Sequence, residues 1–292
     1  FDEIFGYYSL ILNEMYAACG SALGTDPDDP PLEFVGFDTC LMATIDVAAT
    51  FSDIARYMVA SEEVEPGNGW LYSGWAQALA DDTSINGATL GKAICDSFVQ
   101  GCRADGTADS ITLSVVDLTR LEPLLTAYEA FGSEALLSAA ENNRVITQLG
   151  KAASVSENYG GNTKTQGYTN MVDLGSFAEN CSGFLASAAD VQTALQDCVV
   201  YKVNGRYKAQ SGGLSCYYSY NNDRSDLTSY QALTKEQPYK SFAYLAEWQI
   251  NGRPTQEAYD YIEALKSQTA APVQPAQPSE NDALITLSAM GW

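Results

Sequence analysis

Cys40 is the residue of this sequence that is best placed to act as a nucleophile. It follows a short apolar run at residues 33–37 and precedes a segment with helical periodicity at residues 43–54. A thiol at such a turn lies beyond the carboxyl end of a strand and near the positive end of a helix, which lowers its pKa and favours the thiolate. A cysteine packed in the core would suit the same position. Position alone therefore leaves both roles open.

The sequence of 292 residues contains no histidine. A Ser-His-Asp site, a Cys-His site or a histidine-ligated zinc site therefore cannot be completed within this chain. If Cys40 is catalytic, its histidine comes from another polypeptide. The cysteines number seven, form no CxxC pair and stand mostly in apolar surroundings. This pattern indicates small buried hydrophobic residues rather than a disulfide scaffold, with at least one thiol unpaired.

The net charge of −22, from 37 acidic and 15 basic residues, narrows the choice of partners. It opposes binding to nucleic acid and to anionic membranes, and it attracts cationic peptides, although an acidic surface also serves solubility alone. No apolar run is long enough to span a membrane. The first residues show no signal-peptide pattern. Because the chain begins with Phe1 rather than Met, we expect an upstream segment to have been removed.

The elements that would position Cys40 alternate between strand and helix. Apolar and β-branched runs predict strands at residues 33–37, 56–61 and 110–116. Helical periodicity predicts helices at residues 9–23, 43–54, 70–80 and 90–102. The first strand is so apolar that we expect it to be buried in a parallel sheet and paired on both edges. The missing strands would come from the segment before Phe1.

Helices dominate the second part of the chain. They are predicted at residues 118–149, with a break near Gly132, and at 171–178, 188–197, 240–249 and 256–266. Two strands at 199–203 and 214–218 are expected to pair with each other. The predicted division is an α/β domain at residues 1–117, a helix-rich domain at 118–268, and a Pro/Ala/Gln linker and tail at 269–292.

Four blocks of sequence, in this order, resemble the clostripain family of clan CD cysteine peptidases. They are GFDTCLM at residues 36–42, YMVASEEVEPGNGW at 57–70, YTNMVDLGSFA at 168–178 and SGGLSCYYSY at 211–220. The combination of the first two is highly specific. The resemblance implies a caspase-like α/β/α sandwich with a Cys-His dyad, in which Cys40 attacks the scissile carbonyl to form a thioester.

The resemblance also implies a partner chain. In the family, the histidine lies in a His-Gly motif that ends the preceding strand, and zymogen cleavage between the two motifs leaves two associated chains. We therefore expect this chain to be the heavy chain of an autoprocessed enzyme, with a light chain that supplies the histidine and completes the strands. A truncated chain or an inactive paralogue is the alternative. The family further implies a bacterial protein that is secreted or at the cell surface.

Asp38 corresponds to the family residue at the base of the specificity pocket, where a carboxylate selects arginine, or lysine, at P1. Its alternative role is to cap the following helix. The loop that ends near Asn68 is expected to form the other wall. The substrate-binding residues predicted there are Ser61, Glu62, Glu65, Asn68 and Trp70. Trp70 would otherwise pack in the core.

The position of Asn68 weakens the case for strict basic selectivity, because family members often carry an acid near it. Glu62, Glu63 and Glu65 could compensate, or could be solvated loop charges. Calcium dependence is reported for some family members, and the acid-rich loops could supply oxygen ligands. The sequence has no DxDxDG-type loop, however, and no metal ligands are assigned.

The sequence thus predicts a cysteine endopeptidase that cleaves peptides or proteins after arginine, or lysine, by a Cys-His dyad whose histidine lies on a separate chain. Two other functions stay open. A non-catalytic binding protein could keep the peptidase scaffold without the dyad, and a carboxylate-based hydrolase, such as a glycosidase, could use two of the 37 acids.

Overall fold

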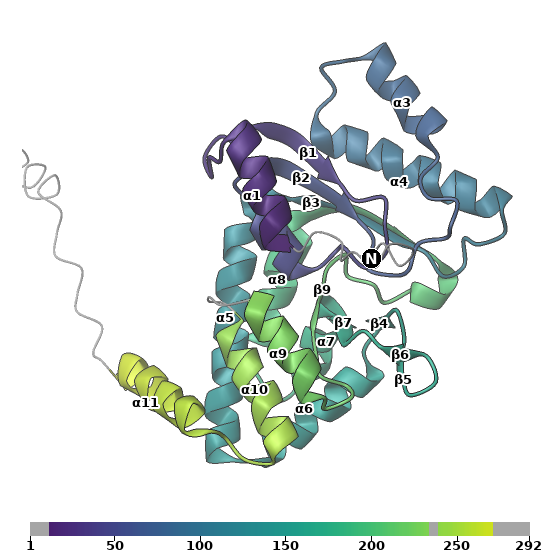
Figure 1. Ribbon diagram of the computed structural model, residues 1–292. Helices are drawn as coiled ribbons and strands as arrows, with labels where there is room; N and C mark the ends of the chain where they lie inside the picture. Colours follow the sequence, from purple (N-terminus) through teal and green to yellow (C-terminus); the bar gives the residue numbers. More distant parts are fainter. Residues whose placement is uncertain (1–11, 234–238, 271–292) are drawn as a thin grey trace, which may run out of the picture.

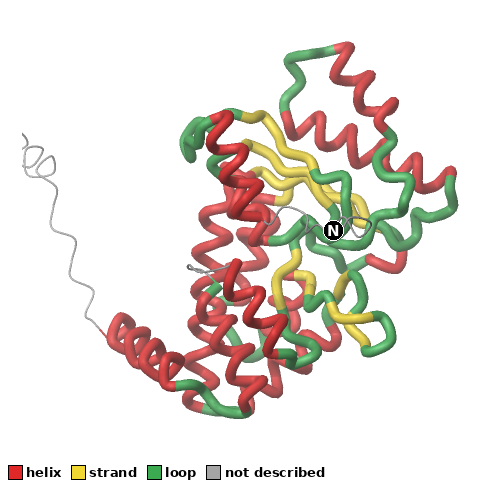
Figure 2. The backbone as a smooth tube through the Cα atoms, in the orientation of Figure 1, coloured by secondary structure: helices red, strands yellow, loops and turns green. Residues whose placement is uncertain are grey.

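A four-stranded mixed sheet organises the computed structural model, which describes residues 12–233 and 239–270 (Figures 1 and 2). Its strands are β1 (Leu32–Gly36), β2 (Ala55–Ala60), β3 (Thr112–Asp117) and β8 (Val199–Asn204). They are adjacent in the order β1-β2-β3-β8. β1 and β2 run parallel, whereas β3 is antiparallel to β2 and β8 is antiparallel to β3. The expected parallel pairing of the first strand is therefore confirmed, but the sheet is mixed and not the parallel sheet that was predicted.

Helices cover both faces of this sheet (Figure 1). On one face, α4 (Gly87–Ala104) buries Ile94 and Phe98 against Val59 and Val115, and α3 (Tyr72–Asp81) packs on α4. On the other face, sheet residues such as Met58 share a continuous core with three helices. These are α2 (Ile45–Phe51), α5 (Leu121–Glu141) and α8 (Ala188–Cys198). One apolar layer on each face of the sheet, covered by helices, confirms the predicted α/β/α sandwich.

The remaining elements extend the second layer. The helices are α1 (Leu12–Leu23), which contacts α2, and α6 (Arg144–Val155), α7 (Leu174–Cys181), α9 (Arg224–Leu233), α10 (Lys240–Asn251) and α11 (Gln256–Ala270). A small antiparallel sheet joins β4 (Asn158–Tyr159), β7 (Met171–Asp173) and β9 (Ser215–Tyr217). β5 (Asn162–Thr163) and β6 (Gly167–Tyr168) form a hairpin. Short 3₁₀ helices span Leu118–Arg120 and Arg206–Lys208. None of the helices in the described ranges is long and apolar enough to cross a membrane.

Two predictions in the second part of the chain are wrong. The strands expected to pair with each other lie in different sheets, because β8 pairs with β3 and β9 pairs with β7. Residues 171–178 are not one helix but β7 followed by α7. The boundary has a local cause: the Asp173 carboxylate caps α7 by accepting a hydrogen bond from the Ser176 N–H at 2.6 Å.

The helix break predicted near Gly132 is also wrong, since α5 runs through this residue and ends at Glu141. Gly132 lies where α10 crosses α5. A Cβ atom there would lie 2.9 Å from Phe242 Cδ2 and 3.1 Å from Ser241 Cβ. The glycine therefore permits close helix packing, at a cost in helix propensity of about 1 kcal/mol relative to alanine.

β1 differs from the fully buried strand that was expected. It lies at an edge of the sheet, and no strand among the described residues pairs with its outer side. Glu33 and Gly36 are exposed, and the other residues of β1 are half-buried. The completion of this edge by further strands stays a prediction. The domain boundary between residues 117 and 118 also stays a prediction. β8 lies after this boundary but pairs in the same sheet as the strands before it. Most of the predicted linker and tail, from residue 271, lies outside the described residues.

Candidate active site

Cys40 lies in the loop between β1 and α2, at the carboxyl end of the two parallel strands. Its side chain is half-buried. α2 begins only at Ile45, and Thr44 caps it by accepting a hydrogen bond from the Val47 N–H at 3.0 Å. The helix predicted at residues 43–54 is therefore present with shorter bounds, Ile45–Phe51.

The backbone beside Cys40 is held in a conformation that few side chains adopt. Leu41 has a φ angle of 65°, in the left-handed region. Its N–H donates to the Glu63 carbonyl at 3.2 Å, and the Ala43 N–H donates to the Ser61 carbonyl at 2.9 Å. Such a backbone costs of order 1 kcal/mol or more and persists only where its surroundings impose it. The two hydrogen bonds fix the nucleophile loop against the segment that follows β2.

Asp38 and Glu65 meet beside this loop, and Trp70 donates to both. The backbone N–H of Trp70 donates to Asp38 Oδ1 at 3.0 Å, and its indole N–H donates to Glu65 Oε1 at 3.3 Å. Cys40 Sγ lies 4.0 Å from the Glu65 carbonyl oxygen. Gly69 makes the turn with a φ angle of 61°, and a Cβ there would lie 2.8 Å from Asp38 Oδ1. Asp38 therefore holds the loop between β2 and α3 in place and does not cap a helix.

The two carboxyl groups differ in exposure. Asp38 is exposed, whereas Glu65 is 9% exposed and its Oε2 atom is buried without a hydrogen-bond partner. Burial raises the pKa of Glu65 to about 8, a shift that the Trp70 hydrogen bond opposes and neighbouring Asp38 reinforces. The Tyr72 hydroxyl is hydrogen-bonded to Asp38, which raises the pKa of that phenol. The two carboxyl groups thus form an acidic pair in which Asp38 is exposed to solvent and Glu65 is buried.

The other predicted wall residues lie elsewhere. Ser61 is buried with its Oγ 3.0 Å from Thr112 Oγ1. Glu62 is buried and accepts a hydrogen bond from the Gly213 N–H at 3.1 Å. Asn68 is exposed on the turn. The Trp70 ring packs in the core below α4, so only its N–H groups face the two acids. The structure thus brings Asp38, Glu65 and Trp70 together and turns Ser61 and Glu62 away from them.

Asp173 is a buried residue of this region that sequence reasoning missed. Besides capping α7, its carboxylate accepts hydrogen bonds from the Tyr159 hydroxyl at 3.1 Å and the Gly212 N–H at 2.5 Å. Glu62 lies beside it, and burial first, then Asp173, raises the pKa of Glu62 well above its ordinary value. The available signal was that Glu62, Asp173 and Gly212 stand in three of the four family-like blocks, which meet here.

Glu63 fastens the same loop on its other side. Its carboxylate accepts a hydrogen bond from the Gly160 N–H at 2.9 Å and lies 2.7 Å from Lys208 Nζ, which also contacts Glu157 at 3.2 Å. Glu63 and Lys208 are both largely buried at this contact. Glu63 is therefore engaged in an ion pair and is not a free acid of the pocket.

A hollow of about 870 Å³ opens beside Cys40, large enough to take peptide side chains. Its walls include the nucleophile loop, α2, and the stacked rings of Tyr217 and Tyr230, whose centroids are 4.1 Å apart. Asn170 also lines it, with a φ angle of 57°, and accepts a hydrogen bond from the Tyr220 N–H at 2.9 Å. Residues of three of the four family-like blocks therefore line one depression.

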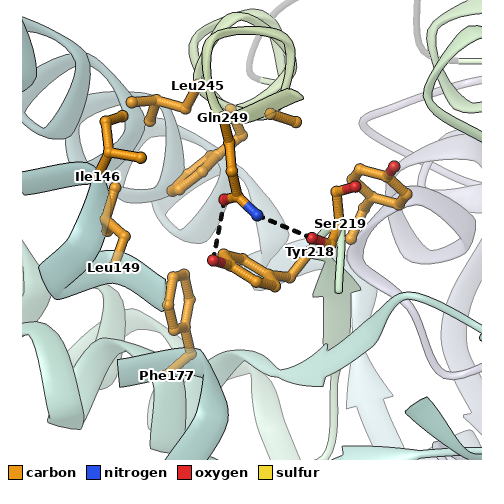
Figure 3. Close-up of a pocket in the computed structure, with 10 residues that line it drawn as sticks. Ile146, Leu149, Phe177, Tyr218, Ser219, Leu245 and Gln249 are labelled. Atoms are coloured by element: carbon orange, nitrogen blue, oxygen red, sulfur yellow. Dashed lines mark hydrogen bonds between the residues drawn. The ribbon is translucent and has the colours of Figure 1, made fainter. Parts of the chain in front are cut away.

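A second cavity contains no residue of the nucleophile loop (Figure 3). Its volume is about 20 Å³, which is room for about one water molecule. Its apolar lining includes Ile146, Leu149, Phe177 and Leu245. At its polar edge, Gln249 accepts from the Tyr218 hydroxyl at 3.0 Å and donates to the Ser219 carbonyl at 3.1 Å. This cavity is a packing gap between α6, α7 and α10.

Burial separates Cys40 from most of the other thiols. All seven cysteines are free, and five are buried: Cys95, Cys102, Cys181, Cys198 and Cys216. Burial raises the pKa of each of the five, to about 12 for Cys181 and Cys198. Only Cys40 and Cys19 are half-buried. Since reactivity requires an accessible thiolate, the five buried thiols are unsuited to catalysis.

No group of three or more His, Cys, Asp or Glu residues within 12–233 and 239–270 is arranged to hold a metal ion. The calcium dependence that the family resemblance implied stays a prediction.

Comparison with known proteins agrees with these features. The model of the clostripain family matches residues 1–252. Among solved structures, a clostripain from Bacteroides thetaiotaomicron in complex with a peptide inhibitor is 18% identical, with a TM-score of 0.57 over 82% of this chain and 98% of that chain. A cysteine protease of B. fragilis is 20% identical, with a TM-score of 0.56 over 82% of this chain and 96% of that chain.

A third similar structure is an inactive zymogen of a C11 protease from Parabacteroides distasonis. It is 17% identical, with a TM-score of 0.54 over 78% of this chain and 62% of that chain. No curated protein matches the sequence. The structural likenesses show that the sandwich is the caspase-like fold of these proteases. Because the family model covers most of its length, the chain belongs to the clostripain family of cysteine proteases.

Proposed function

We propose that this protein is a cysteine endopeptidase that cleaves after basic residues, with Cys40 as its nucleophile and with a histidine supplied by a light chain of the same precursor. The observation that carries this proposal is the position of Asp38 and Glu65 beside the thiol. Cys40 Sγ lies 4.0 Å from the Glu65 carbonyl oxygen, and the side chains of Asp38 and Glu65 meet around Trp70. A basic P1 side chain placed between these acids would bring its own carbonyl carbon to the thiol.

The chemistry follows from this placement. The Cys40 thiolate attacks the scissile carbonyl carbon, the peptide C–N bond breaks, and the histidine protonates the leaving amine. Water then attacks the thioester, with the histidine as general base, and releases the carboxylic acid and the thiol. Backbone N–H groups near Cys40 and beside the histidine would stabilise the oxyanion.

The position of β1 supports a light chain as partner. Its outer edge is unpaired within the described ranges, and Cys40 follows at its carboxyl end. A parallel strand added to that edge would end on the same side of the sheet as Cys40, because the carboxyl ends of parallel strands lie together. A histidine directly after such a strand would therefore come close to the thiol.

Maturation and location belong to the same proposal. One similar structure is an inactive zymogen, and another is a secreted C11 protease of Bacteroides thetaiotaomicron bound to an irreversible peptide inhibitor. We propose an autoprocessed zymogen that is secreted or held at the cell surface. Calcium would act, if it is required, through the acid-rich loops. Dialysis against a chelator followed by a peptidase assay tests that requirement.

Covalent labelling of the assembled enzyme tests the central proposal. A biotinylated peptide acyloxymethyl ketone with arginine or lysine at P1 should label the chain at Cys40, as located by mass spectrometry. The same peptide with glutamate at P1 should not label it. Cys40→Ala should abolish both labelling and peptide cleavage.

Cys19→Ala is the matched control, because Cys19 is the other half-buried free thiol. It should leave both signals intact. Labelling at Cys19 would overturn the proposal. Cleavage that survives Cys40→Ala would also overturn it and favour a carboxylate-based hydrolase, whereas a wild type with neither labelling nor cleavage would favour a binding protein.

A further inference from the structure

We propose, resting on the function proposed above, that Lys208 is a positioning residue for the nucleophile, because its ammonium group joins the two segments that fix the peptide bond after Cys40. Lys208 ends the short 3₁₀ helix that follows β8. Its Nζ atom lies 2.7 Å from Glu63 Oε2 and 3.2 Å from Glu157 Oε1. It also donates a hydrogen bond to the Asn158 carbonyl at 2.7 Å. One cation from a distant part of the chain is therefore shared by two segments.

The first of these segments is the loop after β2, which holds the backbone beside the nucleophile. The Glu63 carbonyl accepts a hydrogen bond at 3.2 Å from the Leu41 N–H, which belongs to the peptide bond between Cys40 and Leu41. The Glu63 N–H donates to Thr112 Oγ1 at 2.9 Å, at the start of β3. Glu63 is therefore held by the sheet at its backbone and by Lys208 at its side chain.

The second segment is the turn between β4 and β5, which packs on the Leu41 side chain. A Cβ atom at Gly160 would lie 3.2 Å from Leu41 Cδ1, so the turn approaches that side chain closely. The Gly160 N–H donates to Glu63 Oε1 at 2.9 Å, and Lys208 binds the start of the same segment through Glu157. Leu41 is thus held by the loop at its N–H and by the turn at its side chain.

The positive charge of Lys208 joins the two segments. Glu63 and Glu157 each place a carboxylate on the same ammonium group, and both carboxylates are largely buried there. Without the cation, these two charges would stay uncompensated at a contact that solvent screens poorly, and they would repel each other. The loop and the turn would then separate, and Leu41 would lose both of its supports.

This loss would act on the nucleophile rather than on the acids of the pocket. A left-handed residue such as Leu41 persists only while its surroundings impose that conformation, so its release would let the peptide bond after Cys40 rotate. Asp38 and Glu65 are held instead by hydrogen bonds from Trp70. Removal of the ammonium group should therefore slow attack on the carbonyl carbon and leave binding of the P1 side chain nearly unchanged.

The test measures labelling of the assembled enzyme by a peptide acyloxymethyl ketone with lysine at P1. Its kinetics separate into KI, which reports binding, and the limiting rate constant kinact, which reports attack by Cys40. Lys208→Met should lower kinact about tenfold and change KI less than about twofold, because misplacement of a reacting atom acts on the attack step. Lys208→Arg should keep kinact within about threefold of the wild type, because it retains the cation.

Arg206→Met is the matched control, because Arg206 lies on the same 3₁₀ helix and pairs with Asp109 at 2.7 Å. It removes the same charge and should change neither constant. Glu63→Gln replaces Lys208→Met if that variant does not fold, as checked by urea denaturation. Glutamine keeps an oxygen for the Gly160 N–H but loses the carboxylate at Lys208, so kinact should fall about threefold with KI unchanged.

Unchanged kinact in folded Lys208→Met or Glu63→Gln enzyme would overturn this inference and leave the proposed peptidase intact. A rise in KI alone would also overturn it, because it would give the residue a part in substrate binding. An equal loss in Lys208→Met and Arg206→Met would overturn it in favour of a general effect of charge. The absence of labelling at Cys40 in the wild type would instead overturn the proposed function.

Discussion

Two pairs of carboxyl groups depend on the same loop after β2, and they differ in how they are enclosed. Glu62 and Asp173 are 1% and 0% exposed and accept hydrogen bonds from residues of other segments, including Tyr159, Gly212 and Gly213. Asp38 and Glu65 are held by Trp70, with the Tyr72 hydroxyl also on Asp38, and Asp38 is exposed. In both pairs the glutamate has a raised pKa, and burial is the leading cause.

The comparison shows why a shifted pKa alone does not identify a binding site. The donors around Glu62 and Asp173 come from several segments, so that pair links the loop to the small sheet and to the start of α7. The donors around Asp38 and Glu65 come from the loop and from the first residue of α3 directly after it, and solvent reaches one of the two acids. The enclosed pair is therefore suited to stability, and the open pair is suited to binding a cation.

The largest effect is expected from Asp173→Ala. The substitution removes the cap of α7 and leaves the Gly212 N–H without its acceptor. The Tyr159 hydroxyl also loses Asp173 as an acceptor but keeps Ser211 Oγ at 2.9 Å. The free energy of unfolding should fall by roughly 2–4 kcal/mol, measured by urea denaturation. Asp223→Ala is the control, since Asp223 makes comparable hydrogen bonds to Ser225 at an exposed site. An equally small change in both variants would show that the enclosed pair is not structural.

Asp38→Asn should do the opposite, by weakening substrate binding while leaving stability nearly unchanged. The amide oxygen can still accept the Trp70 N–H, but the negative charge is lost. For substrates with lysine or arginine at P1, kcat/KM should fall roughly 30-fold. A peptidase assay and a denaturation curve on the same preparation separate the two effects. Unchanged kcat/KM would remove Asp38 from the pocket.

Glu62→Gln should change the pH dependence of stability. In the unfolded chain Glu62 ionises near its ordinary pKa of 4.5, but in the folded chain the raised pKa keeps it protonated. This group's contribution to stability is therefore complete below about pH 4.5 and is lost as pH rises toward its folded pKa. Glutamine does not ionise, so its contribution does not fall as pH rises. By pH 8 the free energy of unfolding of the variant should therefore have increased by on the order of 1 kcal/mol relative to that of the wild type.

Urea denaturation at pH 5 and pH 8 measures that gain. Glu122→Gln, on the exposed face of α5, should show the same pH trend as the wild type. If the difference in stability between Glu62→Gln and the wild type is the same at pH 5 and pH 8, Glu62 is already ionised in the folded chain.

The open site was more predictable from sequence than the enclosed one. Cys40 and Asp38 stand on one loop, and Glu65 and Trp70 stand on the loop that follows the adjacent strand, so local motifs were enough to bring them together. The enclosed pair depends on contacts such as Glu62 with Gly213, which are 151 residues apart in sequence. No periodicity reveals such a contact.

The same distinction applies to the fold. β8 has alternate half-buried and exposed residues, which is the pattern of a strand with one covered face, and its prediction as a strand is confirmed. Its partner was wrong, because alternation does not tell which strand lies alongside. The apolar run at β1 predicted a buried strand paired on both edges, whereas β1 lies at an edge of the sheet among the described residues and is half-buried or exposed.

The smallest effect, and the sharpest test of the comparison, is expected from Trp70→Phe. Phenylalanine keeps the backbone N–H on Asp38 but removes the indole N–H from Glu65. Because that hydrogen bond lowers the pKa of Glu65, its loss should raise this pKa further above about 8. Labelling by a lysine inhibitor should then fall about threefold at pH 7 and recover at pH 9, where Glu65 ionises again. Trp75→Phe is the control, because the Trp75 indole N–H has no hydrogen-bond partner to lose. An equal decrease at both pH values would mean that Trp70 acts only by packing.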